Sequence, residues 1–165
     1  MPPLPAVNTP FGRLWPMATD AGLYTIARSP LPVEVPVPLD LDRSREAARR
    51  LRAWFDGDLH ELEMALDLRR TARFDRAVYA AVRTIPWGET ASYAEVAMMA
   101  GHPGAARAVG SALRRCEVAP VVPCHRVIHA DGRIGGWGSD IAVKRWLLER
   151  EARAERDGSE PFDLI

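Results

Sequence analysis

Proline placement is the strongest constraint on how this chain of 165 residues can fold. Nine of its 14 prolines lie within the first 38 residues. Proline removes a backbone donor and clashes with the preceding helical turn, so this stretch is expected to be non-helical. Residues 11–15 and 22–27 alternate between apolar and polar side chains around a turn at 19–22, which predicts a β-hairpin. Residues 30–38 are expected to be an extended connector.

The remainder of the first 70 residues completes a small lobe. Residues 44–55 have a helical pattern that ends at Gly57, and 62–68 alternate again and predict a further strand. We therefore expect an α+β lobe over residues 1–70. No candidate catalytic residue lies in it, and its expected role is structural.

From residue 71 the apolar spacing becomes helical. Phe74, Val78, Val82 and Ile85 recur at intervals of four, four and three residues, which predicts a helix that stops at Pro86. Ser92 and Glu95 form a potential capping box for a helix over 93–100, and a third helix is predicted over 105–115. Two helices joined by a short glycine-containing turn form a helix-turn-helix, here at about 92–115, although an ordinary helical hairpin has the same pattern.

Charge and side-chain size give this region a modest similarity to DNA-binding surfaces. The net charge of the chain is zero, but residues 71–116 carry six basic and three acidic residues. A solvated helix face explains this excess equally well. The third helix begins with small residues, Ala105, Ala106 and Gly110, around a single long cation, Arg107. Small residues let a backbone approach closely, as minor-groove binding requires.

Residues 121–128 carry the clearest chemical signal. The segment predicts a buried strand interrupted by Pro123, and Cys124 is followed directly by His125. A thiol beside an imidazole suggests an activated nucleophile, but neighbours in a strand point to opposite faces, and a buried structural cysteine is the plainer interpretation. The same segment would also suit a Cys116–Cys124 disulfide or, despite unusual spacing, a zinc site formed by Cys116, Cys124, His125 and His129.

Several motifs in register extend the signal well beyond the cysteine. The chain resembles the O6-alkylguanine-DNA alkyltransferases in Pro123-Cys124-His125-Arg126-Val127. It also resembles them in order and spacing from about residue 74 to 151, through Phe74, Val78-Tyr79, Pro86-Trp87-Gly88-Glu89-Thr90, Ser92-Tyr93, Ala105-Ala106-Arg107-Ala108-Val109-Gly110, Lys144-Arg145-Trp146-Leu147-Leu148 and Glu151. The resemblance covers nearly half of the chain.

The resemblance implies a fold, a reaction and a site. The expected fold is α+β, with the small N-terminal sheet and helix lobe (1–70) and a mostly helical C-terminal alkyltransferase and DNA-binding domain (71–165) that contains a short active-site strand. The implied reaction is a single transfer of an alkyl group from O6-alkylguanine in DNA to Cys124, after the base flips out. The expected catalytic residues are Cys124, His125, Glu151, Tyr93 and Lys144. The expected DNA-binding residues are Ala105, Ala106, Arg107, Gly110, Arg114 and Arg115. The expected base pocket comprises Tyr93, Val127, Trp137, Gly138 and Ser139.

The expected partner is double-stranded DNA, bound through its minor groove by a monomer, with no cofactor, no metal and no membrane. The absence of a signal peptide pattern and the presence of only two cysteines favour the cytoplasm, or the nucleoid in a prokaryote. The chain departs from the family pattern at Cys116-Glu117, where Asn-Pro is usual, at Trp137, where tyrosine is usual, and at Asp140, where glycine is usual. These departures favour slow transfer, and they leave open a relative that binds lesions with weak or no transfer.

Overall fold

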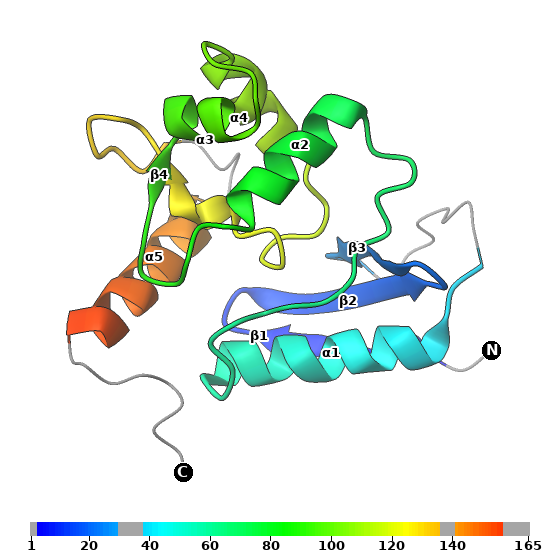
Figure 1. Ribbon diagram of the computed structural model, residues 1–165. Helices are drawn as coiled ribbons and strands as arrows, with labels where there is room; N and C mark the ends of the chain where they lie inside the picture. The colour runs from blue at the N-terminus through cyan, green and yellow to red at the C-terminus, as the bar shows by residue number, and fades with distance from the viewer. Residues whose placement is uncertain (1–2, 30–37, 136–140, 157–165) are drawn as a thin grey trace. The chain divides into compact units, whose positions relative to one another are not determined.

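The computed structural model describes residues 3–29, 38–135 and 141–156. The chain divides into two compact units, one ending at Arg70 and the other beginning at Thr71. Figure 1 shows the elements of each unit.

The first unit is built on a three-stranded antiparallel sheet in the order β1-β2-β3. Its strands are β1 (Val7–Thr9), β2 (Gly12–Thr19) and β3 (Gly22–Ala27). The predicted hairpin is therefore present as β2 and β3. Pro16 lies in the central strand, but β1 pairs only with residues 12–14, so β2 has one neighbour at Pro16 and loses no ladder bond on the other side.

A single long helix packs against this sheet. Helix α1 (Leu41–Asp56) begins at Asp40, whose side chain accepts a hydrogen bond from the backbone N–H of Arg43. It ends at Gly57, which has a φ of 89° that favours glycine. Its buried face includes Leu51 and Trp54 and packs against β1 and β2.

For this unit, one predicted strand is wrong, one observed strand was not predicted, and the predicted connector lies almost entirely outside the described residues. The strand predicted over 62–68 is wrong, because only Leu66 forms a bridge, parallel to Leu23. The backbone at Gly22 approaches Ala65 so closely that a Cβ would lie 2.5 Å from the Ala65 carbonyl oxygen, which accepts a hydrogen bond from the Leu23 N–H at 2.8 Å. Strand β1 was not predicted, and of the expected connector only residue 38 is described.

The second unit is mostly helical, with α2 (Arg73–Val82), α3 (Tyr93–Met99), α4 (Ala106–Arg114) and α5 (Ile141–Arg156). The predicted capping box is formed, since the Ser92 side chain accepts from the Glu95 N–H and the Glu95 carboxylate accepts from the Ser92 N–H. Helices α3 and α4 contact each other and α2 (Figure 1). The hydroxyl of Tyr79 on α2 donates to the carbonyl of Ala112 on α4 at 2.8 Å.

Two short segments bring distant parts of this unit together. Strand β4 (Ala91–Ser92) pairs in parallel with β5 (Val127–Ile128). The buried strand predicted over 121–128 is thus only two residues long, and Cys124–Arg126 form a 3₁₀ turn, η1, instead. Pro123 supplies no backbone donor, and its carbonyl accepts from the Arg126 N–H at 2.9 Å, which closes the turn.

Candidate active site

A cavity of about 540 Å³ opens in the second unit between α3, α4 and the turn that carries the cysteine. Its lining is contributed by segments from residue 93 to residue 129, namely Tyr93, Ala106, Arg107, Gly110, Ser111, Leu113, Arg114, Cys124 and His129. A cavity of this size can admit a base-sized ligand.

Cys124 contributes to the lining of this cavity. It is the first residue of η1 and its N–H donates to the Val122 carbonyl at 2.7 Å. Its side chain is only 1% exposed, yet it forms part of the cavity lining. The thiol is therefore shielded from bulk water but accessible to a group that enters the cavity.

Next to the cysteine in the chain, a histidine and an arginine form a buried network with a carboxylate of α5. His125 Nε2 lies 2.7 Å from Glu151 Oε1, on α5. Arg126 donates to both carboxylate oxygens of Glu151 at 3.0–3.2 Å and to the Ile85 carbonyl at 2.7 Å. Cys124 thus lines the cavity while its neighbour His125 contacts Glu151 on α5.

The network fixes the protonation state of its members. Burial raises the pKa of Glu151, but hydrogen bonds from His125 and Arg126 outweigh burial and hold that pKa at about 2. The carboxylate is therefore ionised and accepts a hydrogen bond from the Nε2–H of His125. Burial lowers the pKa of His125 although Glu151 opposes the shift. A neutral imidazole with its proton on Nε2 keeps a lone pair on Nδ1, which is the form needed to act as a base.

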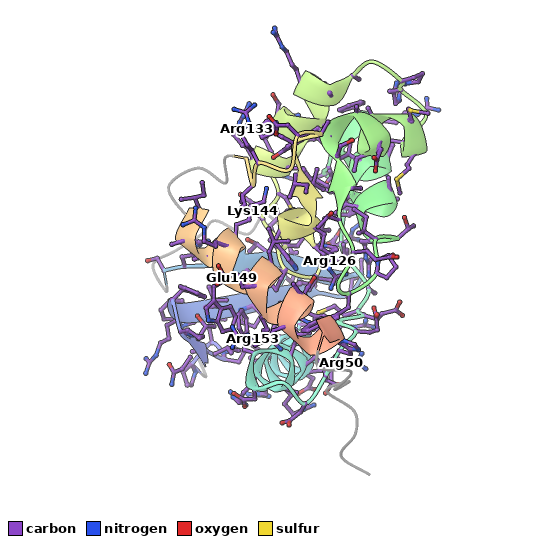
Figure 2. All side chains as sticks on the ribbon, turned by 90° about the vertical axis from the view of Figure 1, so that its left-hand side faces the viewer. Arg50, Arg126, Arg133, Lys144, Glu149 and Arg153 are labelled. Atoms are coloured by element: carbon purple, nitrogen blue, oxygen red, sulfur yellow. The ribbon has the colours of Figure 1, made fainter. Side chains whose placement is uncertain are left out.

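A buried lysine supplies positive charge near the cysteine. Lys144, near the start of α5, is 1% exposed and donates from Nζ to the Val127 carbonyl at 2.6 Å. Figure 2 labels it together with Arg126. Burial lowers the pKa of Lys144 to about 8, against the opposing effect of the Cys124 thiolate. The neighbouring Cys116 thiol and burial raise the pKa of Cys124, and the Lys144 charge opposes this shift by favouring the thiolate.

An aromatic wall closes one side of the cavity. The rings of Tyr93 and His129 have centroids 5.1 Å apart, and Lys144 Nζ lies 5.8 Å from the Tyr93 centroid. Gly135, with a φ of 79°, packs so tightly here that a Cβ would lie 2.9 Å from the Tyr93 hydroxyl. Burial and the Cys124 charge raise the pKa of Tyr93, which keeps its hydroxyl protonated.

Helix α4 forms the outer wall and carries the cationic side chains predicted to bind DNA. Arg107 and Arg114 are exposed and line the cavity. Arg115 instead makes a two-pronged ion pair with Asp75 on α2, at 2.8 and 2.9 Å, so it also anchors the end of α4.

The structure brings most of the predicted site residues into one region. Cys124, Tyr93, Ala106, Arg107, Gly110 and Arg114 line one cavity. His125, next to Cys124 in the chain, contacts Glu151, and Lys144 donates to the Val127 carbonyl. Ala105 immediately precedes α4. Trp137, Gly138 and Ser139, together with Asp140, lie outside the described residues.

The sequence did not predict a role in this site for two of its residues, Arg126 and His129. Arg126 was noted only as part of the motif, although a basic residue inside an apolar segment could have signalled a buried ion pair. His129 was considered only as a zinc ligand. No group of three or more histidine, cysteine or acidic side chains suited to a metal ion occurs in the described parts of the chain, and both cysteines are free thiols. No described helix is long and apolar enough to cross a membrane.

Comparisons with known proteins show similarity to one family of proteins over most of the chain. A family model described as 6-O-methylguanine DNA methyltransferase, DNA binding domain, matches residues 73–153. A Mycobacterium bovis methylated-DNA–protein-cysteine methyltransferase is 51% identical over 112 residues, 67% of each chain. A Methanosarcina acetivorans protein of the same name is 44% identical over 107 residues, 65% of this chain and 68% of the relative. The crystal structure of Mycobacterium tuberculosis OGT in complex with DNA has a TM-score of 0.77 and 40% identity, covering 90% of this chain and 91% of that one.

Proposed function

The chain belongs to the 6-O-methylguanine DNA methyltransferase family, and from that premise we propose that Cys124 is the residue that accepts the alkyl group. Its activity is that of a methylated-DNA–protein-cysteine methyltransferase, which repairs DNA by alkyl transfer to a cysteine. The observation that carries the assignment to Cys124 is its position in the lining of the cavity, next to His125, which contacts Glu151.

The buried network would prepare the thiol for attack. His125, held neutral by burial and oriented by Glu151, accepts the thiol proton at Nδ1 through a water molecule. Lys144 stabilises the resulting thiolate by its charge. Arg126 neutralises Glu151, so the ionised carboxylate can remain buried while it orients the imidazole.

In the transfer step the Cys124 sulfur attacks the alkyl carbon attached to O6 of the flipped guanine. A sulfur–carbon bond forms, the carbon–O6 bond breaks, and the guanine leaves with the electron pair of that bond. The protonated Tyr93 hydroxyl, at the cavity wall, hydrogen-bonds the base and assists its protonation. The thioether product is stable and no cofactor returns the cysteine to its thiol form, so each molecule acts once.

The chain binds DNA, and we assign the contact to α3 and α4. The small residues Ala106 and Gly110 allow α4 to approach the minor groove closely, and Arg107 fills the gap that the flipped base leaves in the stack. A single copy of the chain contains all these groups, so we propose that it acts as a monomer.

The test uses duplex DNA with one labelled O6-methylguanine. The wild-type chain should take up one label per molecule, and peptide mass spectrometry should place it on Cys124. The Cys124→Ser variant should accept none, because a hydroxyl is far less ionised at neutral pH, while it still binds the duplex. Label on Cys116, or transfer by the serine variant, would overturn the assignment.

A specific observation favours a second candidate, lesion binding with weak transfer. The neighbouring thiol of Cys116 and burial raise the pKa of Cys124. A less ionised thiol attacks more slowly. The same experiment separates the two candidates, because lesion binding alone gives a complex with DNA but no label on the protein.

A further inference from the structure

His129 has no role in the reaction proposed above, although its side chain lines the cavity together with Cys124. It follows β5 directly, and its backbone is fixed by two hydrogen bonds within a tight turn. The His129 N–H donates to the Arg133 carbonyl at 2.9 Å, and the His129 carbonyl accepts from the Gly132 N–H at 3.0 Å. The backbone that carries the imidazole is therefore anchored on both sides of the peptide unit.

The imidazole itself is enclosed by two neighbours. Its centroid lies 5.1 Å from the centroid of the Tyr93 ring, with an angle of 46° between the ring planes. The backbone at Gly135 comes so close that a Cβ there would lie 3.1 Å from Cδ2 and Nε2 of His129. The same Cβ would lie 2.9 Å from the Tyr93 hydroxyl, so the two rings and the Gly135 backbone meet at one point. An imidazole packed in this way has little room to rotate.

Tyr93 depends on packing for its orientation. Within the described parts of the chain, no hydrogen bond fixes its hydroxyl. On α4, Gly110 approaches the ring, and a Cβ there would lie 3.8 Å from Cε1 and 3.9 Å from Cδ1, but glycine has no side chain to hold the ring. Lys144 Nζ stands 5.8 Å from the ring centroid. The fixed imidazole is therefore a support against which the Tyr93 ring can keep one orientation.

We propose that His129 is a positioning residue, which holds the Tyr93 ring so that its hydroxyl faces the flipped guanine. This inference rests on the proposed function, in which the Tyr93 hydroxyl hydrogen-bonds the base and assists its protonation. A group that gives a proton must lie within about 2.6–3.2 Å of the atom that receives it. A displacement of about 1 Å can lower a rate on the order of a hundredfold. Loss of the imidazole therefore slows the transfer step through Tyr93.

Two substitutions separate the planar ring from its bulk. His129→Phe keeps a planar ring, whereas His129→Leu fills much of the space without one. Single-turnover transfer at a series of DNA concentrations gives a half-saturating concentration, which reports binding, and a maximal rate constant, which reports the later steps. We expect His129→Leu to lower the maximal rate constant about tenfold or more with little change in the half-saturating concentration. His129→Phe should recover most of the rate, and His60→Leu, which removes an imidazole from the first unit, should change neither quantity.

A double-substitution cycle tests whether the effect passes through Tyr93. In the Tyr93→Phe background there is no hydroxyl to orient, so His129→Leu should lower the maximal rate constant further by less than about twofold. Melting curves check that each variant is folded at the assay temperature. A loss as large in the Tyr93→Phe background as in the wild type would mean that His129 acts on the base directly, and would overturn the proposal.

The orientation of the Tyr93 ring can be measured without DNA, by NMR of the full chain with labelled tyrosine and glycine. The approach of Gly110 to the ring predicts a nuclear Overhauser effect between the Tyr93 ring protons and the Gly110 α-protons. Loss of the signal in Tyr93→Phe assigns it. The effect should persist in His129→Phe and weaken in His129→Leu, and an unchanged effect in His129→Leu contradicts a positioning role.

The two measurements distinguish failure of this inference from failure of the proposed function. If the wild type transfers no label but the Overhauser effect weakens in His129→Leu, the proposed function fails and the contact that positions Tyr93 stands. If the wild type transfers the label and His129→Leu matches its maximal rate constant, the proposed function stands and the role of His129 is refuted.

Discussion

Glu151 is the residue on which the active-site network depends, because its carboxylate accepts from His125, from Arg126 and from the Gly88 N–H. Glu151→Gln leaves the Arg126 charge buried without a counterion, and breaking a buried ion pair costs about 3–5 kcal/mol. The transfer rate should fall about a hundredfold or more, since His125 loses its orientation. Denaturant unfolding and single-turnover transfer measure the two effects. Glu149→Gln, an exposed change on the same helix, should alter neither.

The same carboxylate predicts how stability depends on pH. Its pKa is about 2 in the folded chain and about 4.3 in an unfolded one. A lowered pKa contributes stability that is present above the unfolded value and is lost as the pH falls from about 4 through about 2. Urea unfolding at a series of pH values should show this loss in the wild type, and Glu151→Gln should show a smaller one. Curves with the same slope over that interval would mean that the Glu151 charge contributes nothing.

Cys116 offers a test of how the nucleophile is tuned. The neighbouring Cys116 thiol raises the pKa of Cys124, and burial raises it further. In Cys116→Asn the amide oxygen can accept hydrogen bonds from backbone N–H groups of the loop that follows residue 116. The amide nitrogen can donate a hydrogen bond to the Cys124 sulfur. We expect a lower pKa of Cys124, seen as faster alkylation by iodoacetamide at neutral pH, and faster transfer at equal stability. Equal rates would show that Cys116 is neutral for the reaction, and a slower rate would assign it a supporting role.

At the scale of elements, the sequence predicted the features that depend on residues close together in the chain. The hairpin, α1 with its end at Gly57 and the capping box at Ser92 were all found, because turn chemistry and caps are encoded within a few residues. Alternation over 62–68 was misleading, since a strand also needs a partner along its length. Strand β1 has only three residues, too few for a pattern.

Only part of the candidate site could be predicted from local sequence patterns. Most of its residues came from the family resemblance, and periodicity alone gave α3 and α4 but no chemistry. The bond from Arg126 to Glu151 joins residues 25 apart, and no local pattern encodes such a distance. The 3₁₀ turn at Cys124–Arg126 depends on Pro123 and on packing against α5, so the apolar run suggested a longer strand.

Two substitutions on helix α4 can separate an effect on the cavity from an effect on the stability of the helix. A Cβ at Gly110 would meet Tyr93 at 3.8 Å, an ordinary contact, so Gly110→Ala should raise the free energy of unfolding by about 0.5–1 kcal/mol. The added methyl group narrows the cavity, so transfer from bulky O6-alkyl groups should slow more than transfer of methyl. Ala108→Gly, on the exposed side of α4, should destabilise by a similar amount without changing that preference. Equal slowing for both lesions would place Gly110 outside the path of the alkyl group.

At the scale of the whole molecule, charge must account for DNA binding by a chain whose net charge is zero. The basic excess lies in residues 71–116, within the second unit, and two of its exposed arginines, Arg107 and Arg114, line the cavity. We propose that the second unit carries the DNA contact and that the first unit is structural. A protein with few phosphate contacts should show a shallow dependence of affinity on salt.

Three arginine variants test this division of roles. Each phosphate contact contributes about 0.9 to the slope of log affinity against log salt concentration. Arg114→Ala should reduce the slope by up to about that amount, on any duplex. Arg107→Ala should instead reduce the fluorescence of 2-aminopurine placed beside the lesion, because its side chain replaces the extruded base. Arg45→Ala, on α1, removes the same charge from the first unit and should change neither quantity. An equal loss of slope in Arg45→Ala would show that the first unit also contacts DNA, and unchanged extrusion in Arg107→Ala with a reduced slope would make Arg107 a phosphate contact only.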